Sequence, residues 1–213
     1  MRYVNERRTR KEQQAQTRTD LLEAAVRVYG EHGLVGASLE QVATEAGYTK
    51  GAVYANFSGR DELLLAVLDK RFAERLAALD DVLAQDLPIE AQARVGGEEF
   101  QLHLGGDRRW ERLFFEFAAH AARDEGFRIE LVARWRALVE RIAEALQRRA
   151  EAEGHALSVP TRTLGLAVFA TANGVALQQL LDPDGVPDGF FATVLELLAI
   201  GALARDASTT GAP

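Results

Sequence analysis

The sequence predicts an all-α protein of about nine helices, in which a three-helix helix-turn-helix domain continues into a larger helical domain. Apolar residues recur at intervals of three and four along most of the 213 residues. No stretch alternates apolar and polar residues for long enough to form a sheet. With 47% hydrophobic residues, the chain can bury a substantial core.

The N-terminal segment is basic and leads into the first expected helix. Residues 1–12 hold five Arg and Lys against two Glu, and we expect them to form an arm. From about Thr17 to His32 the apolar residues return at helical spacing, and Gly33 ends the run. We expect this helix to lie across the back of the next two and to complete a three-helix unit.

Residues 38–57 predict two short helices joined by a tight turn. Ser38 is a good N-cap, and Gln41 can return a bond to its backbone N–H in a capping box. Gly47 ends the first helix, because glycine tolerates positive φ, and Thr49 caps the second. This is the helix-turn-helix pattern, and its second helix is a candidate DNA-reading element. The alternative is an ordinary helical hairpin.

The fourth helix is expected to follow without a linker. Ser58 is placed to cap it, with Asp61 at the third helical position. Neither Pro nor Gly interrupts residues 60–86, which predicts a semi-rigid connecting helix over residues 58–85. The expected domains are residues 1–57, the arm plus the helix-turn-helix domain, and residues 58–204, a larger helical domain. Residues 205–213 are a polar tail.

The rest of the larger domain reads as all helix. Gly96-Gly97 is expected to interrupt the first of its segments, Asp107 to cap the next, and Gly126 to end that one. The expected helices cover residues 89–104, 107–121, 127–153, 160–181 and 188–204.

Residues 163–181 form an uncharged run whose length falls in the transmembrane range. Asn173, two glutamines, two threonines and the absence of flanking basic clusters argue against a membrane span. The last helix is also apolar almost all round, as buried helices are. The alternatives are a subunit interface over residues 160–204, a monomer core and a membrane span. We favour the interface, since Ala170 and Gly174 would let a partner helix approach closely.

The charge is unevenly distributed. The formal net charge is −7, yet residues 1–60 carry nine Lys and Arg against seven Asp and Glu, while the remainder carries sixteen against twenty-five. A basic end on an acidic body suits a protein that docks on DNA through one end. The alternative is a solvated basic tail with no partner.

Composition excludes several other classes of protein. There is no cysteine, which excludes disulfides and thiolate metal sites and fits a cytoplasmic protein. The four His residues have no spacing of four, so no zinc site is expected. The N-terminus lacks the apolar segment of a signal peptide. No nucleophile elbow, phosphate loop or cofactor fingerprint is present, so we expect no enzyme and no cofactor.

A longer motif can be followed from Ser38 to Leu64. It consists of Ser38-Leu39-x-x-Val42-Ala43, then Ala46-Gly47-Tyr48-Thr49-Lys50-Gly51-Ala52-Val53-Tyr54-x-x-Phe57, then Arg60-x-Glu62-Leu63-Leu64. This stretch resembles the DNA-binding signature of the tetracycline-repressor (TetR) family of bacterial regulators. The resemblance implies an all-α, nine-helix homodimer joined by its two C-terminal helices. It further implies that the larger domain serves effector binding and dimerisation.

The resemblance also implies roles for individual residues. Ser38, Tyr54 and Arg60 would bond phosphate oxygens, and other residues of the second short helix would face base edges, where Lys suits guanine and Asn suits adenine. A glycine in that helix would allow close approach to the duplex, although it can also be a tolerated surface glycine. Tyr54 can instead belong to the core, and an additional groove contact by Arg7, Arg8 and Arg10 is left open. The expected DNA-binding residues are Ser38, Thr49, Lys50, Gly51, Ala52, Tyr54, Asn56 and Arg60.

Aromatic side chains of the larger domain are the best pointers to an effector. They can wall an apolar cavity for a flat or lipophilic molecule, with nearby polar groups to orient it, although each aromatic residue can equally be core. The expected ligand-binding residues are His103, Trp110, Phe114, Phe117, His120, Arg134, Trp135, Phe169 and Asn173.

These features predict a one-component transcriptional repressor that binds a pseudo-palindromic operator in double-stranded DNA as a homodimer. A small, largely apolar effector would release it. The alternative is a helical dimeric protein-docking module, or a small-molecule-binding protein that binds no operator.

Overall fold

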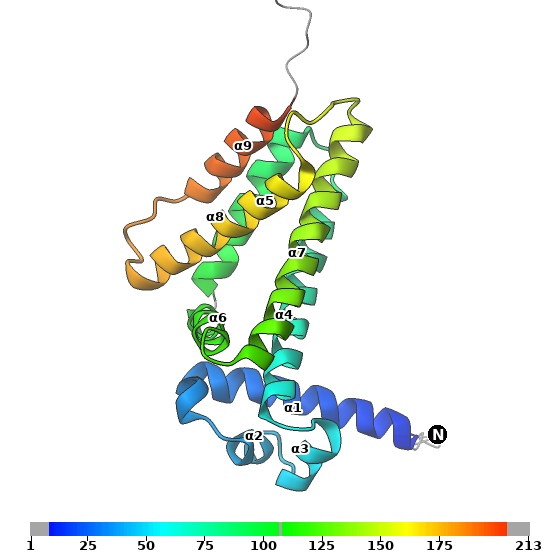
Figure 1. Ribbon diagram of the computed structural model, residues 1–213, viewed down its shortest axis with the longest axis vertical. Coiled ribbons are helices and arrows are strands. Elements are labelled where there is room, and N and C mark those ends of the chain that lie inside the picture. The colour runs from blue at the N-terminus through cyan, green and yellow to red at the C-terminus, as the bar shows by residue number, and fades with distance from the viewer. Residues whose placement is uncertain (1–8, 107, 204–213) are drawn as a thin grey trace, which may run out of the picture. The chain divides into compact units, whose positions relative to one another are not determined.

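The computed structural model describes residues 9–106 and 108–203, with the side chains of residues 103–106 left out of the description (Figure 1). The described residues form nine helices, which confirms the all-α prediction. The helices are α1 (Arg10–Gly36), α2 (Leu39–Glu45), α3 (Lys50–Asn56), α4 (Arg60–Leu83), α5 (Ile89–Gly106), α6 (Arg108–Ala121), α7 (Glu125–Ala152), α8 (Thr161–Leu181) and α9 (Phe190–Ala202).

The chain forms two compact units that do not coincide with the sequence division after residue 57. Among the described residues, the first unit contains the chain up to Arg71 together with Arg112–Arg128. The second contains the described residues of Phe72–Glu111 and the chain from Ile129 to residue 203. Helices α4, α6 and α7 therefore each contribute residues to both units. The functional division at residue 57 remains a prediction, but part of α6 and the start of α7 belong spatially with the helix-turn-helix.

Helix α1 begins earlier than expected. Thr9 is its N-cap, and the Thr9 hydroxyl and the Glu12 carboxylate form a reciprocal capping box. The prediction of an arm through residue 12 and a helix from Thr17 is therefore wrong at residues 10–16, and residues 1–8 lie outside the described part. The Thr-x-x-Glu spacing is the sequence signal that marks this start. Gly33 breaks the helix as predicted, with φ of 70°.

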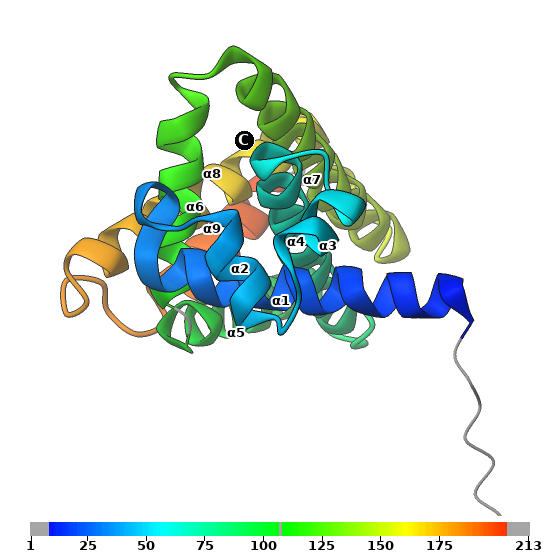
Figure 2. The ribbon, with the colours of Figure 1, turned by 90° about the horizontal axis from the view of Figure 1, so that it is seen from below.

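The first three helices share one core. Leu21 and Tyr29 of α1 are fully buried, as is Val42 of α2. Val53 on the inner face of α3 and Phe57 just past its end are each 1% exposed. Figures 1 and 2 show α1 lying across α2 and α3, which confirms the predicted arrangement.

Helix α4 is uninterrupted from Arg60 to Leu83, as expected from the lack of Pro and Gly. Its N-terminal contact differs from the expected Ser58–Asp61 pairing. The Glu62 carboxylate accepts the backbone N–H of Ser58 at 2.8 Å. Hydrogen bonds from Ser58 to this carboxylate lower the pKa of Glu62.

Two glycine-based predictions for the larger helical domain are wrong. Helix α5 continues through Gly96-Gly97. Gly97 is needed there because it packs directly against α9. A Cβ at position 97 would stand 2.4 Å from the Cα of Ala192. Gly126 does not end a helix either. It is the second residue of α7, whose start is marked by the Asp124 carboxylate accepting the N–H of Phe127 at 2.8 Å.

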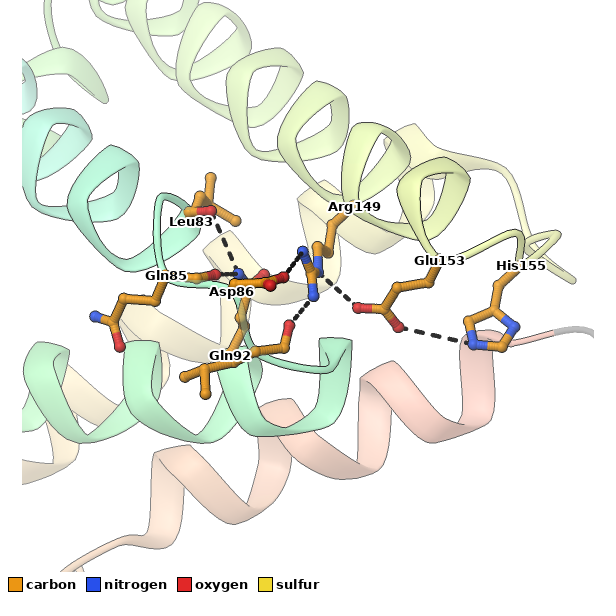
Figure 3. Close-up of polar contacts among 8 residues, drawn as sticks. Leu83, Gln85, Asp86, Gln92, Arg149, Glu153 and His155 are labelled. Carbon is orange, nitrogen blue, oxygen red and sulfur yellow. Dashed lines mark hydrogen bonds and ion pairs between the residues drawn. The ribbon is translucent and has the colours of Figure 1, made fainter.

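The corner between α4 and α5 is held by polar side chains (Figure 3). The buried Gln92 amide donates to the carbonyls of Gln85 at 2.6 Å and Leu83 at 3.3 Å. The Arg149 guanidinium donates to the carbonyl of Leu87 and pairs with Glu153 at 2.6 Å. Because a buried carbonyl without a partner is costly, these bonds fix the corner.

Helices α8 and α9 leave large apolar side chains exposed in the single chain. A Cβ at Gly174 would meet open space. Helices α8 and α9 are therefore not fully buried within a single chain. In the described part of the chain, α8 is the one helix with the length and apolar composition to cross a membrane. The exposed large apolar residues of the two helices are Leu166, Leu177, Leu181, Phe190, Leu197 and Ile200.

Candidate nucleic-acid interface

The ends of α2 and α3 are fixed by their own side chains. The Ser38 hydroxyl accepts the N–H of Gln41 at 3.2 Å, and the Gln41 side chain accepts the N–H of Ser38 at 2.8 Å. The Thr49 hydroxyl accepts the N–H of Ala52 at 3.3 Å. Gly47 has φ of 75°, which permits the tight turn. All of these features were predicted, and they give α3 a defined orientation.

Helix α3 has one buried and one exposed face. The buried face carries Val53, followed by Phe57 just past the helix end, and anchors the helix. The exposed face presents Lys50, Gly51 and Tyr54, whose side chain is 52% exposed. A tyrosine this exposed is not a core residue, so the alternative interpretation of Tyr54 as core does not hold.

Asn56 is half-buried, and its side chain is engaged within the protein. Its amide donates to the carbonyl of Ala52 at 2.8 Å. Its backbone carbonyl accepts from the Arg18 guanidinium, which also lies 4.1 Å from the centre of the Phe57 ring. A contact between Asn56 and adenine would therefore require the amide to exchange this partner, and the base-reading role remains a prediction.

Arg60 points into the first unit in this structure. Its guanidinium donates to the carbonyl of Leu34 and lies over the Tyr29 ring, 5.8 Å from the centroid. The N–H of the same Leu34 donates to the Glu116 carboxylate at 2.5 Å. Burial raises the pKa of Tyr29, and the nearby Arg60 charge partly offsets this. A phosphate contact by Arg60 remains a prediction that requires the side chain to turn outward.

One exposed contact of this surface was not anticipated from the sequence. The Lys50 ammonium lies 2.6 Å from the Glu40 carboxylate, so the first residue of α3 is paired with the second residue of α2. Hydrogen bonding to Lys50 lowers the pKa of Glu40, and the same bond raises the pKa of Lys50. Both groups are therefore charged near neutral pH. They lie ten positions apart in the sequence, and no local spacing rule joins them.

Comparison with protein families decides the classification. The family model described as "Bacterial regulatory proteins, tetR family" matches residues 21–67. A second family model, described as "BetI-type transcriptional repressor, C-terminal", matches residues 98–199. The chain belongs to the TetR family of transcriptional regulators. Members of this family are DNA-binding regulators and not enzymes, which agrees with the prediction from the sequence.

Individual relatives support this classification. TtgW of Pseudomonas putida, named as an uncharacterized HTH-type transcriptional regulator, is 41% identical over 75 residues, covering 35% of this chain and 53% of that protein. The transcriptional repressor AcnR of Corynebacterium diphtheriae is 29% identical over 135 residues, covering 62% and 65%. The chain thus spans less than two thirds of the length of these curated relatives.

A solved repressor structure has a similar fold over most of the chain. SmeT, the repressor of the Stenotrophomonas maltophilia multidrug efflux pump SmeDEF, superimposes with a TM-score of 0.66 at 23% identity, covering 92% of this chain and 96% of SmeT. At this identity the likeness establishes the fold alone.

The predicted ligand residues lie in the segment matched by the C-terminal TetR-family model, but they are divided between the two compact units. Phe114, Phe117 and His120 belong to the first unit. There Phe117 stacks on Phe127 with ring centroids 6.1 Å apart, and the His120 ring meets Phe127 edge-on at 4.7 Å. His120 also lies 3.8 Å from the Asp61 carboxylate. These contacts are those of a packed core.

In the second unit, Trp110 is buried and Asn173 is half-buried. Trp135 and Phe169 are half-buried and lie with ring centroids 5.7 Å apart, and Arg134 pairs with Glu130 at 2.8 Å. The His103 side chain lies outside the described residues. The ligand-binding roles of all these residues remain predictions.

Two further features of the second unit were not predicted. Glu111 is buried and pairs with Arg75 at 2.5 Å, and the Arg75 guanidinium lies 4.9 Å from the centre of the Phe100 ring. A surface depression of about 270 Å³ involves none of the predicted ligand residues. It is lined by Glu140, Ala143, Glu144, Gln147, Arg148, Thr161 and Arg162.

Proposed function

We propose that this chain is a one-component cytoplasmic repressor that binds a pseudo-palindromic operator as a homodimer and is released by a small, largely apolar effector. Two copies of α3 would enter successive major grooves, about 34–36 Å apart. An effector would favour a spacing of the two α3 helices that no longer fits the operator. This requires that the effector bind the two states with different affinities.

The main support for the proposal is the arrangement of the side chains of α3. Val53 and Phe57 anchor it, Thr49 caps it, and the opposite face offers an ammonium, a bare glycine backbone and a phenol to solvent. These groups suit the major groove, where Lys reaches guanine acceptors, and the phosphate backbone, where hydroxyl groups bind.

Dimerisation through α8 and α9 is supported by their exposed apolar faces. Leu166, Leu181 and Leu197 are each more than half exposed in the single chain. A second copy that covers these side chains would gain about 25 cal/mol for each Å² of apolar surface removed from water. An isologous interface of this kind also produces the two-fold symmetry that a palindromic operator requires.

The effector proposal rests on chemistry and on a relative. Trp135 and Phe169 provide half-buried aromatic surface, with Asn173 as a polar group on the same helix as Phe169. The solved complex of SmeT contains triclosan. Aromatic walls with a few polar groups are typical of sites for lipophilic ligands.

Selection from a pool of random duplexes tests the DNA-binding proposal, because it requires no known operator. We expect the selected sequences to share a two-fold symmetric pattern, and binding to them to weaken steeply with salt. Arg60→Ala should weaken binding similarly across sequences and reduce the salt slope by about one unit. If the pool yields no preferred sequence at low salt, operator binding is disproved.

Tryptophan fluorescence tests the effector proposal, because the chain has only two tryptophans. Triclosan, as the first probe, and a panel of aromatic and lipophilic compounds should include one that quenches the emission and releases the selected duplex. Trp135→Phe should remove most of the quenching while Trp110 still emits. If no compound of the panel changes either signal, the effector is not of this class.

A further inference from the structure

Helices α2 and α3 are linked on their exposed side by the ion pair of Glu40 and Lys50. The two charged atoms lie 2.6 Å apart, and the side chains are 66% and 52% exposed, respectively. Glu40 precedes α3 in the chain and stands in the first turn of α2, two positions after the capping residue Ser38. A carboxylate therefore lies beside the lysine that begins the candidate recognition helix.

The ion pair itself adds little to the stability of the fold, although the Glu40 charge suits the first turn of α2. Exposed ion pairs contribute little to folding, because water and salt screen them. The two helix starts already have side-chain caps in Ser38 and Thr49. A carboxylate on a surface that meets phosphates also weakens DNA binding at every sequence, unless the DNA offers it a compensating hydrogen bond.

A guanine–cytosine pair offers that compensation in the major groove. Its edge presents the N7 and O6 acceptors of guanine beside the N4 donor of cytosine. The pair of Glu40 and Lys50 presents the complement, an acceptor beside a donor, within one hydrogen-bond length of each other. On an adenine–thymine pair the lysine would meet a single purine acceptor, N7, in place of the adjacent N7 and O6 acceptors that lysine contacts on guanine.

We propose that Glu40 is a specificity-determining residue that acts with Lys50 as one unit and selects a guanine–cytosine pair in each half-site. This inference rests on the proposed operator binding. Glu40 disfavours phosphate backbone in general and accepts from cytosine at the matching position. Lys50 alone would bind guanine or a phosphate with little discrimination, because its ammonium is a point charge on a flexible stem.

The test compares wild type with Glu40→Gln by selection from random duplexes and by titration with calf-thymus DNA. We expect one strongly preferred guanine–cytosine position in the wild-type half-site. Glu40→Gln should relax that position alone, bind calf-thymus DNA more tightly, and lower the ratio of selected to calf-thymus affinity about tenfold or more. In the double variant with Lys50→Ala, replacing Glu40 should have little additional effect on that position, as expected of residues that act together.

Glu45→Gln is the matched control. Glu45 lies at the end of the same helix and forms a similar exposed ion pair, with Arg27 at 2.8 Å. This variant removes the same charge and should keep the wild-type base preferences.

Three results would overturn the inference. The first is a Glu40→Gln profile identical to wild type with an unchanged affinity ratio. The second is an equal loss of preference in Glu45→Gln, which would assign the effect to net charge. The third is a wild type that selects no sequence at all, which would remove the proposed function together with this inference.

Discussion

Two pairs of consecutive helices in this molecule differ in how completely a single chain caps their ends and buries their apolar side chains. The α2–α3 pair is capped by Ser38 and Thr49 and buries its large aliphatic and aromatic anchors. The α8–α9 pair starts at Pro160 and Gly189, which provide no side-chain cap, and leaves leucines more than half exposed. The first pair is complete within one chain, whereas the second leaves the apolar surface that we propose a second copy covers.

The largest expected effect is on the incomplete pair. Leu197→Glu should convert the dimer to monomer, because it places an unpaired charge in the proposed α8–α9 interface, at a cost of about 3–5 kcal/mol. Light scattering coupled to size exclusion measures this, and operator affinity should fall with it. Ile129→Glu is the control, since Ile129 is 57% exposed and lies on α7. A dimeric Leu197→Glu protein would place the interface elsewhere.

The next effect contrasts two phenylalanines. Phe57→Ala should lower the free energy of unfolding by about 3–5 kcal/mol, because the ring is fully buried and its loss leaves a cavity. Phe190 is 44% exposed, and Phe190→Ala should cost the monomer much less while weakening the dimer. Urea unfolding at several protein concentrations separates the two effects. If both variants lose the same free energy of unfolding at every protein concentration, both rings belong to the monomer core.

Two glycines sharpen the comparison further. Gly97→Ala should destabilise the fold by about 1–3 kcal/mol, because the added methyl meets the backbone of Ala192. Gly174→Ala finds open space in the single chain and should stabilise the helix by about 1 kcal/mol in a monomeric background such as Leu197→Glu. In the dimer the same methyl should weaken association. Analytical ultracentrifugation would detect this, and an unchanged dimer constant would exclude Gly174 from the interface.

Loss of one cap is a smaller perturbation. Ser38→Ala should cost about 1 kcal/mol, because the N–H of Gln41 loses its partner at the start of α2. Thr163→Ala, in the first turn of α8, should cost nothing comparable, since α8 has no side-chain cap. Thermal unfolding measures both. Similar losses of stability in the two variants would show that side-chain capping does not distinguish the α2–α3 pair from the α8–α9 pair.

The smallest effect is a difference in pH dependence. Burial raises the pKa of Tyr29 above its ordinary value of 10.0, so the unfolded chain ionises first as the pH rises. The stability from this group is complete below pH 10.0 and falls above it. Tyr29→Phe should therefore lose less stability than wild type between about pH 9 and pH 11 in urea titrations. If the curves of stability against pH for wild type and Tyr29→Phe are parallel, the Tyr29 hydroxyl ionises as in water.

The sequence was sufficient where structure depends on neighbours in the chain. Ser38 with Gln41, the positive φ of Gly47 and the cap at Thr49 follow from spacings of a few residues. It was insufficient at Gly97, which reads as a breaker until Ala192 of a distant helix is known to lie against it.

The candidate site divides in the same way. The motif placed Lys50 and Tyr54 on the exposed face of α3, where the structure has them. It could not foresee that Glu40 holds Lys50, or that Arg60 is engaged by Leu34, because these are contacts between helices. The predicted ligand residues were chosen by type and helical spacing, and such a choice cannot tell which compact unit receives each side chain.

The contacts of Leu34 have a consequence for protein engineering. Its carbonyl is held by Arg60 and its N–H by Glu116, which is 82 positions away in the sequence. A chimera that transplants residues 1–57 onto another sensor domain would leave both partners behind and free the end of α1. The portable module is therefore discontinuous: it needs the chain to Arg71 together with Arg112–Arg128, and a successful graft must carry both pieces.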